Sequence, residues 1–245
     1  MSPSAKTQPQ AWAALQQAVV MCERCPRLTA YRQAVAEKPK KGFTSESYWA
    51  KPVPGLGGQQ AKLLIVGLAP AAHGANRTGR MFTGDGQDGM GAADFLARAL
   101  HRAGLANQAT SRHRDDGFQL IDAYLTAIVR CAPPHNKPTP EEIKTCGSFL
   151  LQEWQLLPEA RVIVALGKLA FDQLCDLLKS AGAPVSRPRP KFGHGVEVDL
   201  PSPWPTLIGS YHPSRQNTQT RLLTPEMFDE IFVRAKQLSG IHRQD

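Results

Sequence analysis

The sequence predicts an α/β fold, a three-layer α/β/α sandwich with a central four-stranded parallel sheet. Short apolar runs alternate with helical stretches along the chain, and this alternation is typical of parallel strands joined by crossover helices. The runs lack polar alternation, which is typical of strands that are buried on both faces. The four predicted strands cover residues 62–69, 123–129, 161–166 and 206–211.

Helices are predicted before, between and after these strands. The segment Thr139-Pro-Glu-Glu142 predicts a helix start, because it combines a capping hydroxyl, a first-turn proline and early acidic residues. Residues 38–60 are predicted to be an extended surface stretch, and residues 182–205 an irregular one with a hairpin at 193–199. The other predicted helices cover residues 11–21, 26–37, 92–103, 168–179 and 225–238.

Length, charge and hydropathy bound the class of protein. The chain has 245 residues and a net charge of +8, which favours a polyanionic partner, most simply nucleic acid. Residues 1–10 are polar and predict a flexible N-terminal segment, and residues 11–245 predict a single domain. The start lacks the apolar stretch of a signal peptide, and no apolar run reaches the ~20 residues that span a membrane. We therefore expect a cytoplasmic protein without a membrane partner.

Four of the five cysteines form two separated sets, Cys22 with Cys25 and Cys131 with Cys146. In a reducing compartment such cysteines are more often metal ligands than disulfides, and four thiolates at one centre select zinc or an iron–sulfur cluster. The long separation of the sets favours a cluster that joins the N-terminal segment to a larger fold, because zinc fingers keep their ligands local. Zinc and unligated buried thiols are the alternatives. Cys175 lies among leucines of a predicted helix, so we expect it in the core.

Three unusual loops follow predicted strands, after Ala69, Val129 and Tyr211. Ligands of parallel α/β sheets bind beyond the carboxyl ends of the strands, so these loops predict one active site. The first loop has neither GxGxxG nor a P-loop motif, which argues against a nucleotide cofactor. Its Phe82 offers a face for stacking and its Asp85 a carboxylate, with a role in a turn as the alternative for Asp85.

The second and third loops supply polar groups suited to nucleic acid. Asn136 carries a donor and an acceptor that can pair with the edge of a base, with a role in a turn as the alternative. His212 stands at a strand end, where an imidazole can stabilise a developing anion, although a lone histidine there is more often structural. Hydrogen-bond donors suited to phosphate and groove contacts follow it: Ser214, Arg215, Gln216 and Asn217.

Together these segments resemble the uracil-DNA glycosylase superfamily, most closely its iron–sulfur type-B branch, family 5. The resemblance runs in order from about residue 12 to residue 240, and such long ordered motifs are far more specific than one short motif. The segments that carry it are CERCPRL at 22–28, GLAPAAHGANRTGRMFTGD at 67–85, RCAPPHNKPTPE at 130–141 and HPSRQNTQT at 212–220.

The resemblance implies a four-stranded parallel sheet between helices and a monofunctional glycosylase of base excision repair. Such an enzyme hydrolyses the N-glycosidic bond of uracil in DNA and leaves an abasic site. The resemblance also implies a structural [4Fe–4S] cluster on Cys22, Cys25, Cys131 and Cys146. Asp85 and His212 are then the expected catalytic residues. The base would contact Leu68, Ala69, Phe82 and Asn136, and DNA would contact Arg77, Arg80, Ser214, Arg215, Gln216 and Asn217.

Two positions separate this chain from other patterns of the superfamily. Other branches place a polar or acidic residue just before the proline of the first motif, whereas Leu68 and Ala69 stand here and have no acid–base chemistry. This is the type-B pattern, and it predicts a less polar pocket that also accepts hypoxanthine or other damaged bases. Arg221 stands where the family pattern has glycine, which restricts the backbone next to the DNA-contacting loop.

Two other classes of protein compete with a glycosylase. A non-catalytic, basic iron–sulfur module that binds DNA would gain nothing from a carboxylate in its cleft. A zinc-stapled hydrolase of small nucleotides would need further His or Asp ligands in these loops. Neither would produce abasic sites in uracil-containing DNA. We expect a monomer, the simplest state for an enzyme that wraps DNA.

Overall fold

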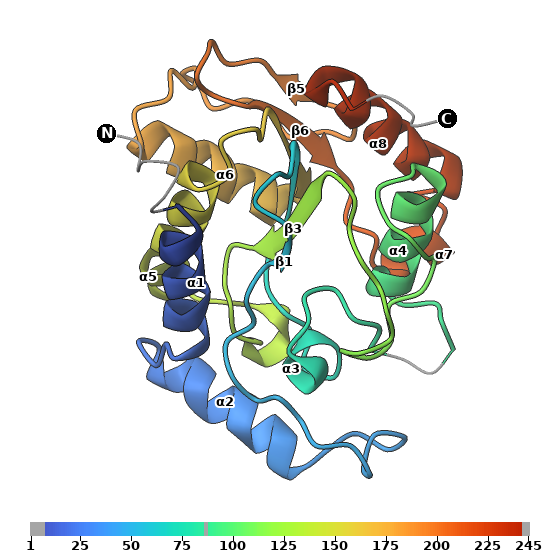
Figure 1. Ribbon diagram of the computed structural model, residues 1–245. Coiled ribbons are helices and arrows are strands. Elements are labelled where there is room, and N and C mark those ends of the chain that lie inside the picture. The colour runs from blue at the N-terminus through green and yellow to red at the C-terminus, as the bar shows by residue number, and fades with distance from the viewer. Residues whose placement is uncertain (1–7, 86–87, 242–245) are drawn as a thin grey trace.

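The computed structural model describes residues 8–85 and 88–241, and it contains the predicted α/β sandwich (Figure 1). The described residues form one six-stranded sheet with the strand order β1-β3-β2-β4-β6-β5. Its four central strands are parallel, as predicted, and comprise β3 (Ala123–Ala127), β2 (Leu63–Gly67), β4 (Val162–Leu166) and β6 (Thr206–Ser210). Two-residue antiparallel strands extend its edges: β1 (Leu56–Gly57) and β5 (Glu197–Val198).

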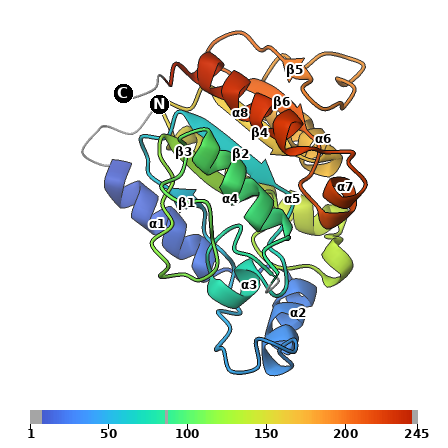
Figure 2. The same ribbon diagram turned by 90° about the vertical axis from the view of Figure 1, so that its right-hand side faces the viewer.

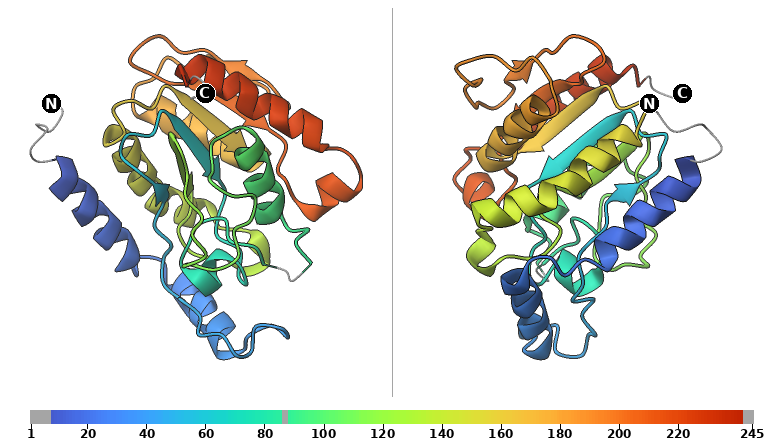
Figure 3. Two further views of the ribbon diagram at one scale, coloured as in Figure 1. Left: turned by 45° about the vertical axis from the view of Figure 1, so that its right-hand side comes forward. Right: turned by 90° about the vertical axis from the view of Figure 1, so that its left-hand side faces the viewer.

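Helices cover both faces of the sheet. One face carries α1 (Gln8–Val20), α5 (Pro140–Gln155) and α6 (Lys168–Ser180) (Figure 3). The other carries α4 (Ala92–Arg102) and α8 (Pro225–Ser239), which pack against each other (Figure 2). Two layers of helices around a parallel sheet bury the strands on both faces, which explains their continuous apolar runs.

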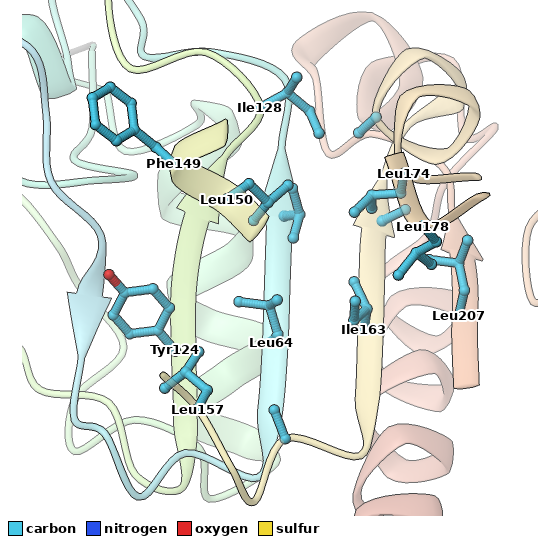
Figure 4. Packing of buried hydrophobic residues seen from close by; sticks show 14 of the residues in the cluster. Leu64, Tyr124, Ile128, Phe149, Leu150, Leu157, Ile163, Leu174, Leu178 and Leu207 are labelled. Atoms are coloured by element: carbon cyan, nitrogen blue, oxygen red, sulfur yellow. The ribbon is translucent and has the colours of Figure 1, made fainter. Parts of the chain in front are cut away.

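Alternate strand residues form two separate cores. Leu64 and Ile163 belong to the core beneath α1, α5 and α6, whereas Leu63 and Val162 belong to the core beneath α4 and α8. Successive side chains of a strand point to opposite faces, so each strand contributes to both cores. Each fully buried side chain of this size stabilises the fold by roughly 1.5–3 kcal/mol. Figure 4 shows the first core, with Leu64, Ile163 and Leu207 of the sheet beside Leu150, Leu174 and Leu178 of the helices.

The predicted helix starts are confirmed, with one extension. Thr139 caps α5: its hydroxyl accepts from the Glu142 N–H, while the Glu142 carboxylate accepts from the Thr139 N–H at 2.8 Å. This reciprocal capping satisfies two backbone donors that the helix leaves free. Helix α1 begins at Gln8, so residues 8–10 of the segment predicted to be flexible are helical. The rest of that expected segment, residues 1–7, lies outside the described residues.

Three short helices interrupt segments predicted as loops: α3 (Ala75–Thr78), η1 (Pro134–Asn136) and α7 (Arg215–Gln219). Helix α2 (Pro26–Glu37) matches its predicted bounds. The expectation for residues 38–60 is only partly right, since Phe43 and Val53 are buried. The N–H of Val53 donates to the Arg130 carbonyl at 2.8 Å, which fixes this stretch to the segment that follows β3. Among the described helices, none combines the length and the apolar character needed to cross a bilayer.

Candidate active site

A cavity of about 490 Å³ lies at the carboxyl ends of the parallel strands, where the three loops meet. Each loop contributes to its wall, as the strand-end rule for parallel sheets predicts. The residues predicted from sequence that line it are Leu68, Ala69, Phe82, Asp85, Asn136, His212, Ser214 and Arg215. The first turn of α6, from Lys168 to Ala170, also lines the cavity and was not predicted. The same rule applied to the strand before α6 would have found it.

Phe82 packs against the end of β2. A Cβ atom on Gly67 would lie 2.7 Å from Cζ of Phe82, so only glycine lets the ring come this close to the strand. The backbone of Phe82 has φ 53°, in the left-handed region. This conformation places a half-buried aromatic face on the cavity wall, where a flat ligand can stack on it.

Asp85 is half-buried and lies between two glycines. A Cβ atom on Gly91 would stand 2.8 Å from its Oδ1, and one on Gly74 would stand 3.4 Å from its Cβ. The close backbone approach fixes the carboxylate at the cavity wall. Within the described residues, no side-chain donor occupies this carboxylate, so its oxygens are available to a ligand or a water.

His212 follows β6, and its backbone carbonyl accepts two hydrogen bonds. The donors are Asn217 Nδ2 and the Ser214 N–H, each at 2.8 Å. Gly167, with φ 97°, allows the close approach of the imidazole, since a Cβ there would lie 3.1 Å from the histidine Cβ. Burial lowers the pKa of His212 to about 4. The imidazole is therefore neutral at pH 7, and it lines the cavity.

Asn136 ends the short helix η1 and reaches the cavity from an exposed position. Its φ is 57° and that of His135 is 54°, and asparagine tolerates this left-handed conformation better than most residues. The turn that the sequence suggested and the ligand contact are therefore compatible, because the turn is what directs the amide to the cavity.

The structure contradicts the DNA contacts predicted for Arg77 and Arg80. Both side chains are buried, with 2% and 6% of their surface exposed. Arg77 pairs with Glu46 and donates to the Gly84 carbonyl at 3.0 Å. Arg80 donates to both carboxylate oxygens of Asp116, at 2.5 and 2.7 Å. These guanidiniums hold the loop around Asp85 in place and are not exposed to a DNA strand.

The four residues predicted to follow His212 on the DNA side divide into two pairs. The Ser214 hydroxyl caps α7 by accepting a hydrogen bond from the Asn217 N–H. The side-chain amide of Asn217 donates to the His212 carbonyl. Arg215 and Gln216 are exposed, and Arg215 lines the cavity mouth. Beyond α7, Arg221 has φ 58°, so an arginine occupies a left-handed conformation that glycine adopts more readily.

The four cysteines predicted as ligands gather from three segments of the chain. Cys22 and Cys25 lie between α1 and α2, Cys131 follows β3, and Cys146 lies in α5. Burial raises the pKa of Cys131 to about 12, with smaller raising contributions from the other three thiols and a lowering one from Arg32. Backbone and side-chain donors reach two sulfurs, since the Arg130 N–H donates to Cys146 Sγ and Arg24 Nε to Cys22 Sγ, both at 3.3 Å.

The donor set suits a soft metal centre, because thiolates prefer iron–sulfur clusters or zinc and N–H donors to sulfur stabilise the thiolate form. Within residues 8–85 and 88–241, however, no three His, Cys, Asp or Glu side chains are arranged to hold a single metal ion. Cys175 is buried in α6, as predicted for a core residue.

A buried ion pair lies next to these thiols. Arg130 pairs with Glu153, and the exposed fractions of the two side chains are 1% and 0%. Tyr124 and Thr126 donate hydroxyls to the same carboxylate at 2.8 and 2.9 Å. Gln16 of α1 donates to the Tyr124 hydroxyl at 3.1 Å. We call these five residues the Arg130 network; it joins the sheet, α5 and α1.

Comparison with known proteins identifies the family. The family model described as "Uracil DNA glycosylase superfamily" matches residues 54–236. The type-5 uracil-DNA glycosylase of Mycobacterium bovis is 48% identical over 224 residues, which cover 91% of this chain and 80% of the relative. The type-5 enzyme of Mycobacterium leprae is 49% identical over 91% of this chain and 93% of its own length. That of Thermus thermophilus is 48% identical over 92% and 97%.

The chain therefore belongs to the uracil-DNA glycosylase superfamily, a family of hydrolases that act on N-glycosyl bonds. Within it, the three relatives all carry the type-5 name, so the predicted resemblance to family 5 is confirmed.

Proposed function

We propose that this protein is a monofunctional DNA glycosylase of base excision repair. It hydrolyses the N-glycosidic bond of uracil in DNA and leaves an abasic site. The observation that carries this proposal is the presence of the Asp85 carboxylate and the neutral His212 imidazole on the wall of one cavity. The type-5 names of the relatives support the same activity.

The cavity can receive a base that has left the duplex. Flipping a base costs a few kcal/mol of lost stacking and pairing, and contacts in the pocket must offset that cost. Stacking on Phe82 supplies one such contact, and the Asn136 amide pairs with the edge of the base. Leu68 and Ala69 form an apolar wall that excludes water without adding a titratable group.

Bond cleavage needs stabilisation of charge on both sides of the bond. The C1′–N bond breaks with its electron pair going to the base, which becomes anionic, while the sugar becomes cation-like. The Asp85 carboxylate stabilises that cation electrostatically and holds a water against C1′. Attack by this water forms the new C–O bond, and the proton that the water loses neutralises the base anion. The neutral N–H of His212 donates a hydrogen bond to the departing base. This donation is strongest in the transition state, where the negative charge develops.

Binding of DNA depends on the loop that carries α7. Arg215 and Gln216 are exposed on this loop beside the cavity mouth, and we assign them to the phosphate backbone. Ser214 and Asn217 fix the loop and His212, so they position the contact. We propose that residues 11–245 act as one catalytic domain and that the protein works as a monomer on DNA.

The apolar wall also suggests a wider range of substrates. Leu68 and Ala69 offer no polar group that would reject a base by leaving a donor or acceptor unpaired. We propose that hypoxanthine, and other deaminated or damaged bases, are removed besides uracil. A pocket that selects mainly by stacking distinguishes bases less sharply than one that pairs with each polar edge.

We propose that Cys22, Cys25, Cys131 and Cys146 hold a [4Fe–4S] cluster with a structural role. The cluster would join the α1–α2 segment to the sheet, and no step of base removal depends on it. Cys131→Ser should remove the brown colour and most of the soluble protein, while Cys175→Ser should change neither. Wild-type protein prepared without oxygen that is colourless and contains stoichiometric zinc would overturn the assignment.

Matched end-labelled duplexes containing uracil or hypoxanthine test the activity. The protein is incubated with each, abasic sites are cleaved with alkali, and the product is measured. Product from both duplexes supports the glycosylase and its wide pocket, whereas product from uracil alone keeps the enzyme and rejects the wider range. No product from protein with an intact cluster would favour the competing function, a DNA-binding module without catalysis.

A further inference from the structure

An ion pair joins two of the loops that form the cavity. Arg215 of α7 donates to both carboxylate oxygens of Asp88, at 2.8 and 2.7 Å, although the two residues are 127 positions apart. We call this ion pair the clasp. Arg215 lines the cavity, and Asp88 lies three residues before Gly91, which lines it from the opposite loop. The clasp therefore joins the first and third loops of the active site.

In the clasp, Asp88 binds Arg215, the cation that we assign to the DNA backbone. Two described cationic residues line the cavity, Lys168 and Arg215, and each is paired with a carboxylate. Lys168 pairs with Asp172 in its own helix, so only the clasp connects separate segments. A guanidinium that binds both oxygens of a carboxylate presents the same fork that binds two oxygens of a phosphate.

The exposure of the clasp makes it easy to exchange. The side chains of Arg215 and Asp88 are 43% and 46% exposed, and exposed pairs contribute little to stability because water and salt screen them. The hydrogen bond from Arg215 lowers the pKa of Asp88, so the carboxylate is ionised at pH 7. Asp88 thus competes for Arg215 without fixing it permanently.

We propose that Asp88 stands in for a DNA phosphate in the free protein, and that DNA binds by taking Arg215 from it. The exchange moves one guanidinium from a carboxylate to a phosphate and releases the two loops at the cavity mouth. Asp88 then weakens DNA binding by competing for Arg215. A residue with a purely structural role would instead support binding by keeping the loops folded. The proposal rests on the DNA binding assigned above, and it adds the residue that limits that binding.

The test compares Asp88→Asn with a matched control. Asparagine keeps an oxygen for the Met90 N–H, which Asp88 Oδ1 accepts at 3.1 Å, but loses the charge that holds Arg215. Asp229→Asn removes the same charge from an equivalent pair, since Arg102 donates to both oxygens of Asp229 at 2.7 Å. Neither Arg102 nor Asp229 lines the cavity.

Binding to an undamaged duplex is measured by fluorescence anisotropy over a range of salt concentrations. Asp88→Asn should bind about two- to fivefold more tightly than the wild type, which is the range expected for the loss of an exposed pair. Its plot of log affinity against log salt should be steeper by up to about 0.9, the value for one added phosphate contact. Asp229→Asn should show neither change beyond its uniform charge effect.

The double variant Asp88→Asn with Arg215→Gln should bind no more tightly than Arg215→Gln alone, because the gain depends on the freed guanidinium. Unchanged or weaker binding by Asp88→Asn would overturn the proposal, and so would an equal gain in Asp229→Asn. Uracil excision by the wild type is measured in parallel. Its absence would refute the proposed glycosylase while the binding data still decide the role of Asp88.

Discussion

The Arg130 network and the cavity are both rich in polar groups, yet they use them in opposite ways. In the network, the Glu153 carboxylate pairs with Arg130 and accepts hydrogen bonds from Tyr124 and Thr126, so its charge is balanced inside the protein. In the cavity, Asp85 and His212 keep their reactive atoms toward open space. Buried polar groups must be paired inside the protein, whereas groups that face a cavity can be left for a substrate.

The difference shows which property each region controls. Substitution of a buried group that is paired inside the protein, such as Glu153, changes the free energy of unfolding. Substitution of a group that faces the cavity, such as Asp85, changes the activation free energy of the reaction and leaves the fold nearly intact. The substitutions below test this separation, beginning with the largest expected effect.

Asp85→Asn should lower the single-turnover rate of uracil excision by about 10²- to 10⁴-fold, because the amide neither stabilises the sugar cation nor orients water for attack. Rapid-quench assays at saturating protein measure the rate, and DNA binding and the unfolding midpoint are measured alongside. Asp115→Asn, an exposed carboxylate outside the cavity lining, is the control. Loss of binding and midpoint together with the rate would assign Asp85 to the fold.

Glu153→Gln should lower the free energy of unfolding by about 3–5 kcal/mol, because it leaves the Arg130 charge buried without its partner. Urea unfolding followed by fluorescence measures the change. Glu197→Gln breaks the exposed pair with Arg234 and should cost less than about 1 kcal/mol. If Glu153→Gln unfolds at the wild-type midpoint but excises slowly, the separation of the two regions fails.

Phe82→Ala should raise the substrate concentration for half-maximal excision by about 5- to 150-fold, which corresponds to about 1–3 kcal/mol of lost stacking. Phe82→Tyr keeps the ring and should restore most of the affinity. A titration of uracil duplex under single-turnover conditions measures both. An alanine variant with wild-type affinity would show that the base does not stack on this ring.

The pH dependence of stability should report His212. Its pKa is about 4 in the fold and about 6.5 when unfolded, so the unfolded chain takes up the proton first as pH falls. The stability associated with the neutral imidazole is present above about pH 6.5 and is lost as pH falls toward 4. Between pH 7 and 5 the wild type should lose about 1–2 kcal/mol more than His212→Asn. Equal losses in urea unfolding would show that the imidazole is not buried as described.

Much of the fold could be predicted because local patterns agree with the final packing. The continuous apolar runs at Leu63–Gly67 and Val162–Leu166 marked strands buried on both faces, and the sheet buries them in this way. The edge strand at Leu56–Gly57 was missed because two residues carry no periodic pattern. Pairing with β3 defines it, and that contact joins distant parts of the chain.

For the candidate site, sequence reasoning found residues but not their partners. The strand-end rule brought the loops of Asp85, Asn136 and His212 to one place. The rule does not tell an exposed arginine from a buried one, so Arg77 and Arg80 were assigned to DNA although Glu46 and Asp116 bind them. The clasp was not predicted either, because Asp88 and Arg215 are distant in sequence and no local pattern pairs them.

The left-handed backbone of Phe82, His135, Asn136 and Arg221 has a consequence for engineering. Among the described residues outside glycine, six have positive φ, and these four lie in the loops at the carboxyl end of the sheet. Each such conformation costs of order 1–3 kcal/mol, so backbone strain is concentrated in the loops that form the cavity. Glycine at Arg221 would relieve strain at no cost to the cavity wall, whereas relief at Phe82 or Asn136 would remove the side chain that the strain holds in place. Selection for heat resistance should therefore accept changes at Arg221 first and reach a limit where strain and substrate recognition share a residue.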